Sequence, residues 1–133
     1  MPGPLPLERI VPPGRFKGDV PLSLAVKAGG HVFVSGVPAY DAHGRLAAGD
    51  FPAQMTQVME NIAAILAAAG TGWHRVTRTR VYLTRTTDVA AMNRLYATYF
   101  PDGGFPARTT IVVHALPNPD FLLEIECEAM MAS

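Results

Sequence analysis

The sequence predicts an α+β fold in which two helices pack on one face of a mixed β-sheet. Three observations lead to this prediction. The predicted elements run strand pair, helix, strand, helix, strand pair, an order typical of helices layered on one side of a sheet. The chain has 133 residues, which suffices for one hydrophobic core but not for two. Apolar residues make up 49% of it, enough to fill such a core.

Composition narrows the class of protein further. Eleven basic and eleven acidic residues cancel, and only 17% of the chain is charged. This balance excludes a disordered, highly charged chain and argues against a nucleic-acid-wrapping protein, which carries a basic excess. No stretch approaches the roughly 20 apolar residues of a membrane span, and no signal peptide precedes the domain, so we expect a cytoplasmic protein. The low charge also indicates that part of the surface faces another subunit.

The N-terminal segment differs in amino-acid composition from the rest of the chain. Six of the twelve prolines lie within residues 1–21, so we expect residues 1–20 to form a proline-rich arm with one short strand near 8–11. Residues 21–133 then form a single domain. Residues 22–28 and 31–35 are β-prone and are separated by Gly29-Gly30, which predicts a hairpin. A glycine-punctuated loop follows and reaches residue 49.

The first helix has the strongest pattern in the chain. Asp50 is suited to cap its start, Pro52 is tolerated in the first turn, and Gly70 marks its end. Apolar residues recur at the three-and-four spacing of one helical face: Met55, Val58, Met59, Ile62, Ile65, Leu66 and Ala69.

Alternation and turn residues define the remaining elements. We expect a strand over 75–84, a helix over 88–100, and two closing strands over 107–114 and 121–130. The residues expected to face the helices are Val32, Val34, Val81, Leu83, Ile111, Val113, Leu123 and Ile125. The opposite face is expected to carry Phe33, Val76, Tyr82, Val112 and Leu122. A second sheet face with this many apolar residues favours an oligomer in which the sheets of neighbouring subunits pack together.

Common catalytic motifs are absent from the chain. It contains no GxGxxG, GxxxxGK[ST], HExxH, GxSxG or CxxC, which argues against dinucleotide, P-loop, zinc-protease and serine-hydrolase chemistry. The four histidines are scattered without ligand spacing, so no metal site is expected. The only cysteine, Cys127, cannot form an internal disulfide, and we interpret it as a buried small hydrophobe.

The last two strands hold the candidate site. Arg108 stands at the start of a strand, where its planar fork suits a substrate carboxylate. Glu124, Glu126 and Glu128 alternate along the final strand, and like charges at that spacing raise a carboxyl pKa toward the range useful for proton transfer. Two structural interpretations stay open, because such charges also form ion networks and Arg108 would equally pair with a neighbouring subunit's carboxylate.

An arginine-rich segment offers a different interpretation. Arg75, Arg78, Arg80 and Arg85 would suit an RNA-binding stripe, but in a neutral protein we favour a solvated or subunit-facing strand.

Several segments together resemble one known family. In order and spacing they are PLSLAVKAG (21–29), VFVSG (32–36), QVMENI (57–62), AAAG (67–70), VYLT (81–84), NRLY (93–96), YF (99–100), PARTT (106–110) and LEIE (123–126). This set, covering about residues 21–130, is similar to the reactive intermediate deaminase family, RidA/YjgF, also labelled L-PSP endoribonuclease. The PARTT strand followed by EIE is its most specific part.

The resemblance implies a chorismate-mutase-like fold and a homotrimer with three clefts between subunits. It also implies hydrolysis of reactive enamines and imines to 2-keto acids and ammonia, without a metal or organic cofactor. By position, Arg108 would clamp the substrate carboxylate and Glu124 would activate water. The substrate-binding positions would be Thr110, Ser35, Gly36 and Leu22.

Two positions depart from the family's pattern. Leu22 stands where the family has tyrosine, and Val37 stands where it has glutamine. These departures predict a more apolar pocket and a larger or more apolar imino acid, or an aminomuconate-like semialdehyde derivative, as substrate. Two alternative functions stay open: a trimeric protein that binds small carboxylates without turnover, and an RNA-cleaving enzyme.

Overall fold

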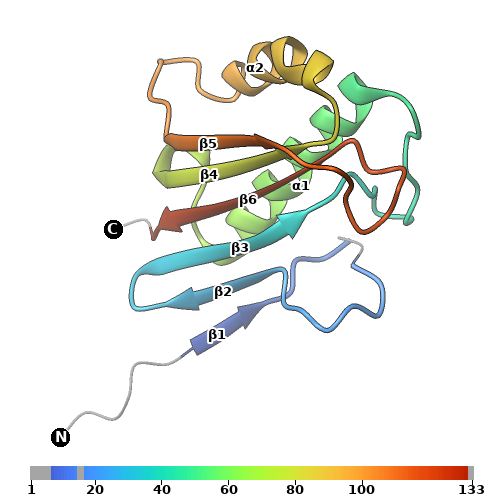
Figure 1. The fold of residues 1–133 in the computed structure, drawn as a ribbon. Coiled ribbons are helices and arrows are strands. Elements are labelled where there is room, and N and C mark those ends of the chain that lie inside the picture. The colour runs from blue at the N-terminus through green and yellow to red at the C-terminus, as the bar shows by residue number, and fades with distance from the viewer. Residues whose placement is uncertain (1–6, 15–16, 132–133) are drawn as a thin grey trace, which may run out of the picture.

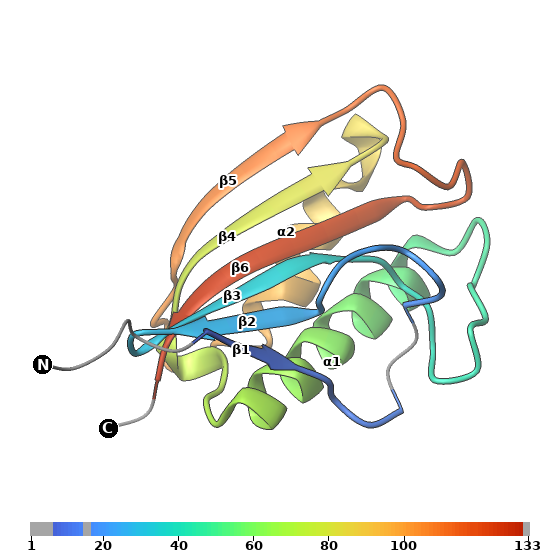
Figure 2. The same cartoon turned by 90° about the horizontal axis from the view of Figure 1, so that it is seen from below.

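A computed structural model describes residues 7–14 and 17–131, and it contains a six-stranded sheet in the order β1-β2-β3-β6-β4-β5. Figures 1 and 2 show that both helices cover the same face of this curved sheet. The predicted α+β class is therefore confirmed. The elements are β1 (Leu7–Ile10), β2 (Ala25–Ala28), β3 (His31–Val37), α1 (Phe51–Ala69), β4 (Val76–Leu83), α2 (Val89–Ala97), β5 (Ala107–Val112) and β6 (Leu123–Met130).

The sheet is mixed, as expected. β4 and β5 pair in parallel, whereas every other neighbouring pair is antiparallel. The C-terminal strand β6 lies in the middle, between β3 and β4, and β5 forms one edge. We call the side of the sheet that α1 and α2 leave uncovered the open face.

Helix α1 forms where its sequence pattern places it. The Asp50 side chain accepts a hydrogen bond from Ala53 N at 3.0 Å, and Gly70 ends the helix in the left-handed region with φ 89°. All seven residues of the predicted apolar stripe are buried, none more than 2% exposed. The stripe packs on the sheet and forms the centre of the core.

Helix α2 is shorter than the sequence predicts. The helix covers Val89–Ala97 instead of residues 88–100, because a 3₁₀ turn over Thr86–Asp88 precedes it and tight turns follow it. Its buried residues are Met92 and Tyr96, one helical turn apart. These two side chains face β5, which matters for the site below.

Several residues lie on a different face of the sheet from the one that the sequence predicts, because strand pairing decides the facing. Val112, in register with the buried Leu83, lies on the helix side instead of the open face. Ile111 pairs with Tyr82 and lies on the open face, 41% exposed, and Val113 falls just beyond β5. Residues 111–113 are a continuous β-branched run without alternation, so only the pairing with β4 sets which side faces the core. Val76 is buried instead of open, because the β4–β6 register shifts next to it. Leu122, which precedes β6, is also buried.

The predicted proline-rich arm is only partly described. β1 pairs with β2 along the sheet edge, and Ile10 belongs to the hydrophobic core. The expected short strand near residues 8–11 is therefore present, shifted by one residue. Residues 1–6 and 15–16 lie outside the described part. Within the ranges that the structure describes, neither helix is long and apolar enough to cross a membrane.

Candidate functional site

A cavity of about 490 Å³ opens beside the ends of β3 and β6. Its volume falls in the range of pockets that hold small organic ligands. Most of its lining is apolar, and the polar groups are few. The lining residues are Lys17, Val20, Leu22, Leu24, Ser35, Gly36, Pro38, Tyr40, Pro117, Asn118, Phe121 and Glu124. Four of the six residues that the sequence nominated, Leu22, Ser35, Gly36 and Glu124, thus lie around one cavity.

Glu124 differs from the two other glutamates of β6. The Glu128 carboxylate accepts a hydrogen bond from Arg80 at 2.9 Å, and Glu126 contacts both Arg80 and the Tyr82 hydroxyl. No hydrogen bond or ion pair to Glu124 is present among residues 7–14 and 17–131. Burial, with the nearby negative charge of Glu126, raises the pKa of Glu124 above its usual value. Glu124 is therefore the carboxylate of the three that is available to a ligand.

Gly36 allows the Glu124 carboxylate to lie against the backbone of β3. A Cβ atom at residue 36 would stand 2.7 Å from Glu124 Oε2. The β3–β6 register shifts between Val34 and Val37, so the backbone at residues 35–36 leaves the regular ladder. Ser35 Oγ donates to Ser23 O at 2.6 Å, which ties this irregular segment to the chain around Leu22.

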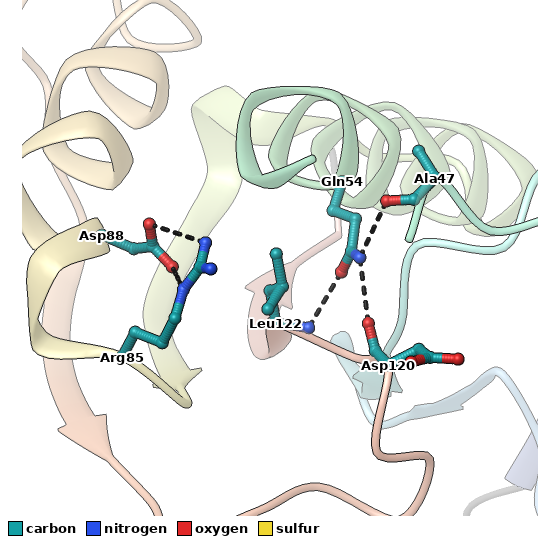
Figure 3. A network of polar contacts seen from close by, with 6 residues as sticks. All are labelled: Ala47, Gln54, Arg85, Asp88, Asp120 and Leu122. Carbon is teal, nitrogen blue, oxygen red and sulfur yellow. Dashed lines mark hydrogen bonds and ion pairs between the residues drawn. The ribbon is translucent and has the colours of Figure 1, made fainter. Parts of the chain in front are cut away.

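Two buried amides of α1 fix the loops that form the cavity walls. Gln54 Nε2 donates to Ala47 O and Asp120 O, each at 3.0 Å, and Gln54 Oε1 accepts from Leu122 N at 2.9 Å (Figure 3). Two turns later, Asn61 Nδ2 donates to Tyr40 O at 2.7 Å. The helix therefore holds the loop before it and the loop before β6 together.

Arg108 lies in a second, separate pocket of about 320 Å³ under α2. Its Nη1 approaches Met92 Sδ at 3.6 Å, and its guanidinium carbon lies 5.0 Å from the centre of the Tyr96 ring. No carboxylate pairs with Arg108 in the ranges that the structure describes. The other lining residues are Asn93, Ala97, Phe105 and Pro106.

Within one chain, Arg108 and Glu124 lie on opposite faces of the sheet. Arg108 is in register with the buried Thr79 and so faces the helices, whereas Glu124 is in register with Tyr82 on the open face. Thr110 follows Arg108 on the helix side, and its buried Oγ1 has no hydrogen-bond partner among the described residues. The six nominated residues therefore form two groups: Leu22, Ser35, Gly36 and Glu124 in one, and Arg108 and Thr110 in the other.

Three of the four arginines of the predicted stripe have partners among the described residues, and Arg78 is the exception. Arg80 pairs with glutamates of β6, Arg85 pairs with Asp88 (Figure 3), and Arg75 donates to Met131 O at 2.8 Å. Cys127 is buried, and burial raises the pKa of its thiol to about 12. In residues 7–14 and 17–131, no three side chains of histidine, cysteine, aspartate or glutamate come together as a metal site requires.

Sequence reasoning missed the cavity walls and the surroundings of Arg108. Tyr40, Asn118 and Phe121 come from irregular loops, where no periodicity marks which side chains turn inward. Met92 and Tyr96 have the spacing of an ordinary apolar helical stripe, which alone does not predict a contact with Arg108.

Comparison with known proteins gives a consistent result. The sequence profile of the family described as Endoribonuclease L-PSP matches residues 14–131. A RutC family protein of Pyrococcus horikoshii is 44% identical over 110 residues, which are 82% of this chain and 86% of that protein. A solved Rid-family structure from Yersinia pestis has a TM-score of 0.90 at 32% identity, and RidA of an Antarctic Psychrobacter has 0.86 at 32%. These alignments cover 95% and 93% of this chain and 100% and 99% of the respective structures.

Proposed function

The chain belongs to the RidA/YjgF family, and from that premise we propose that it hydrolyses 2-imino acids, with their enamine tautomers, to 2-keto acids and ammonia. The observation that carries this proposal is a pair of complementary groups without partners in the described residues. Arg108 is a cation without a carboxylate, and Glu124 is a carboxylate with a raised pKa beside a cavity. Arg108 suits the carboxylate of an imino acid, and Glu124 suits the protonated imine and the water that attacks it.

Arg108 would hold the substrate by its carboxylate. A guanidinium binds a carboxylate through two parallel, charge-assisted hydrogen bonds, which fixes both position and orientation. Because the imine carbon is attached to that carboxylate, the same contact places the reacting carbon. The imine carbon is already electrophilic once its nitrogen is protonated. Holding that carbon in position therefore accounts for much of the rate enhancement.

Glu124 would move the protons. Its carboxylate takes one proton from a water molecule as the water oxygen bonds to the iminium carbon, which gives a neutral carbinolamine. It then returns that proton to the carbinolamine nitrogen, the carbon–nitrogen bond breaks, and the carbonyl forms as ammonia leaves with the remaining proton as ammonium. Iminium and water thus become keto acid and ammonium, with Glu124 unchanged. A raised pKa suits a group that both accepts and donates a proton.

The two groups would meet between protomers of a homotrimer, in a cleft formed by Arg108 of one copy and Glu124 of the next. Since they lie on opposite faces of one sheet, a single chain does not bring them together. Apolar side chains on the uncovered side support an interface: Phe33 is 47% exposed and Ile111 is 41% exposed. β5 is moreover an edge strand, which proteins usually cover.

The oligomer is directly testable by light scattering coupled to gel filtration. We expect a species of about three times the 14.2 kDa mass of one chain, because each copy then buries its open face and β5 edge. A species with the mass of a single chain would contradict the shared cleft.

The reaction is testable with imines generated in situ. An amino-acid oxidase releases a 2-imino acid, and the protein is expected to accelerate the appearance of keto acid and ammonia over the spontaneous rate. Binding of a keto acid without any acceleration would instead favour the carboxylate-binding alternative. RNA degradation that survives repurification and depends on Arg108 would favour the endoribonuclease. The arginine stripe gives the RNA-cleaving alternative little support, since Arg75, Arg80 and Arg85 have partners within the chain and only Arg78 of the four has none among the described residues.

Gly36→Ala tests the placement of Glu124. The added methyl group would overlap Glu124 Oε2, and the flexible carboxylate end would move away, which costs the fold little. We expect keto-acid release to fall by up to about 100-fold, because a misplacement of about 1 Å at a reacting group can cost that much, with an unchanged melting temperature. Gly104→Ala, in an open loop where a Cβ meets nothing within 4 Å, is the matched control. Full activity of Gly36→Ala would show that the carboxylate position is not used.

A further inference from the structure

Arg108 is held by groups that do not neutralise it. Its guanidinium lies over the face of the Tyr96 ring, 5.0 Å from the ring centre, and Nη1 points to the thioether sulfur of Met92 at 3.6 Å. An aromatic face attracts a cation, and a thioether is only a weak acceptor. Neither contact occupies the guanidinium donors as a carboxylate would. The donors of Arg108 therefore stay available for a ligand.

The Tyr96 ring is itself fixed. Tyr96 is only 3% exposed, and its hydroxyl shares a hydrogen bond of 2.7 Å with Oγ1 of the fully buried Thr79. The Phe100 ring lies against it with a centroid distance of 5.1 Å. A ring anchored at its hydroxyl and packed on its side cannot turn away, so it presents one constant surface to the guanidinium.

This arrangement explains how an arginine on an edge strand keeps a defined position. A free arginine side chain loses considerable rotamer freedom when it binds a ligand, and that loss weakens binding. An aromatic platform removes part of this freedom before the ligand arrives. The residue beneath Arg108 should therefore change ligand affinity more than it changes the chemical step.

We propose that Tyr96 is a positioning residue for Arg108: its ring holds the guanidinium in the orientation that binds the carboxylate of a 2-keto or 2-imino acid. The proposal rests on the proposed function for the identity of the ligand. The Tyr96 hydroxyl is bonded to Thr79 and its ring faces the guanidinium, so in this proposal Tyr96 acts through Arg108. Its effect should thus appear in KM and in product binding, with kcat little changed.

The test shows whether the Tyr96 ring acts on Arg108 through its electrostatic attraction for the cation or only through its shape. Residue 96 is replaced by phenylalanine and by its mono-, di- and trifluorinated analogues, which keep the ring shape while they progressively weaken the negative ring face. Calorimetry measures the binding of 2-ketobutyrate, and kinetics on in situ imines give KM and kcat. Tyr99→Leu, which removes another ring of the same aromatic cluster, is the control because Tyr99 contacts Trp73 and not Arg108.

We expect 2-ketobutyrate affinity to fall stepwise with fluorination, by about tenfold over the series, which is the range of a partly desolvated cation–π contact. KM should rise by a similar factor, and Tyr99→Leu should leave both quantities within twofold of wild type. Equal affinities across the series, or no 2-ketobutyrate binding by the wild-type protein, would overturn the proposal. Stepwise loss of binding in a protein without turnover would support the platform while it contradicts the proposed hydrolysis.

Discussion

Arg108→Ala is expected to lower the rate of keto-acid release from 2-imino acids by about 100-fold or more. Two charge-assisted hydrogen bonds to the substrate carboxylate would be lost, and each is worth roughly 1.5–3 kcal/mol. The loss also removes the contact that orients the imine carbon, so both KM and kcat should suffer. Steady-state kinetics on imines generated in situ, with keto acid as the readout, measures the effect.

A matched arginine shows whether the loss is specific. Arg45 lies exposed in the loop before α1, and only its backbone bonds to Asp41. Arg45→Ala should therefore keep the wild-type rate, and light scattering should show the same oligomer for both variants. A wild-type rate in Arg108→Ala would remove Arg108 from the reaction and with it the proposed clamp.

Glu124→Gln is expected to reduce turnover by about 10² to 10⁴-fold, the range of general acid–base catalysis. The amide retains the shape of the carboxylate but cannot accept the proton of water. In the wild-type protein the active form of Glu124 is the carboxylate, so activity should fall as the pH is lowered. Because the pKa of Glu124 is raised, the midpoint of this fall should lie above the usual glutamate pKa of 4.5. The residual activity of Glu124→Gln should lack this acidic limb.

The raised pKa of Glu124 also makes it possible to tell a loss of catalysis in Glu124→Gln from a loss of folding. A carboxyl whose pKa is higher in the folded state favours folding when protonated, and that contribution disappears as the pH rises through the folded-state pKa. At neutral pH the charged Glu124 thus weakens the fold slightly, and Glu124→Gln should melt no lower than wild type. Glu60→Gln, on the exposed face of α1, is the control and should retain activity. Wild-type turnover in Glu124→Gln would exclude the proposed proton transfer.

The sequence predicted those elements whose signals are local. The stripe of α1, its Asp50 cap and its Gly70 end all agree with the structure, because each acts through neighbours within a few residues. The alternation of β6 correctly separated Glu124 from buried Ile125. Helix propensity and strand alternation therefore sufficed for the fold class and for most of the core.

Features set by distant partners were less predictable. The facing of Ile111 depends on the parallel register with β4, which a run of β-branched residues does not reveal. The bulge that turns Val76 inward and the loop contacts of Gln54 likewise arise from pairing across long sequence separations. The sequence nominated Arg108 and Glu124, but only the register shows that one chain places them on opposite faces of its sheet.

That separation makes mixed oligomers the most direct test of the account. Subunits of Arg108→Ala and Glu124→Gln, each nearly inactive alone, are combined in equal amounts by unfolding and refolding together, beside wild-type protein treated in the same way. If each cleft takes Arg108 from one copy and Glu124 from its neighbour, random assembly of a ring gives about one quarter of the clefts both intact residues. We therefore expect about one quarter of the wild-type rate of keto-acid release. A mixture no more active than its two parents would contradict a site shared between subunits.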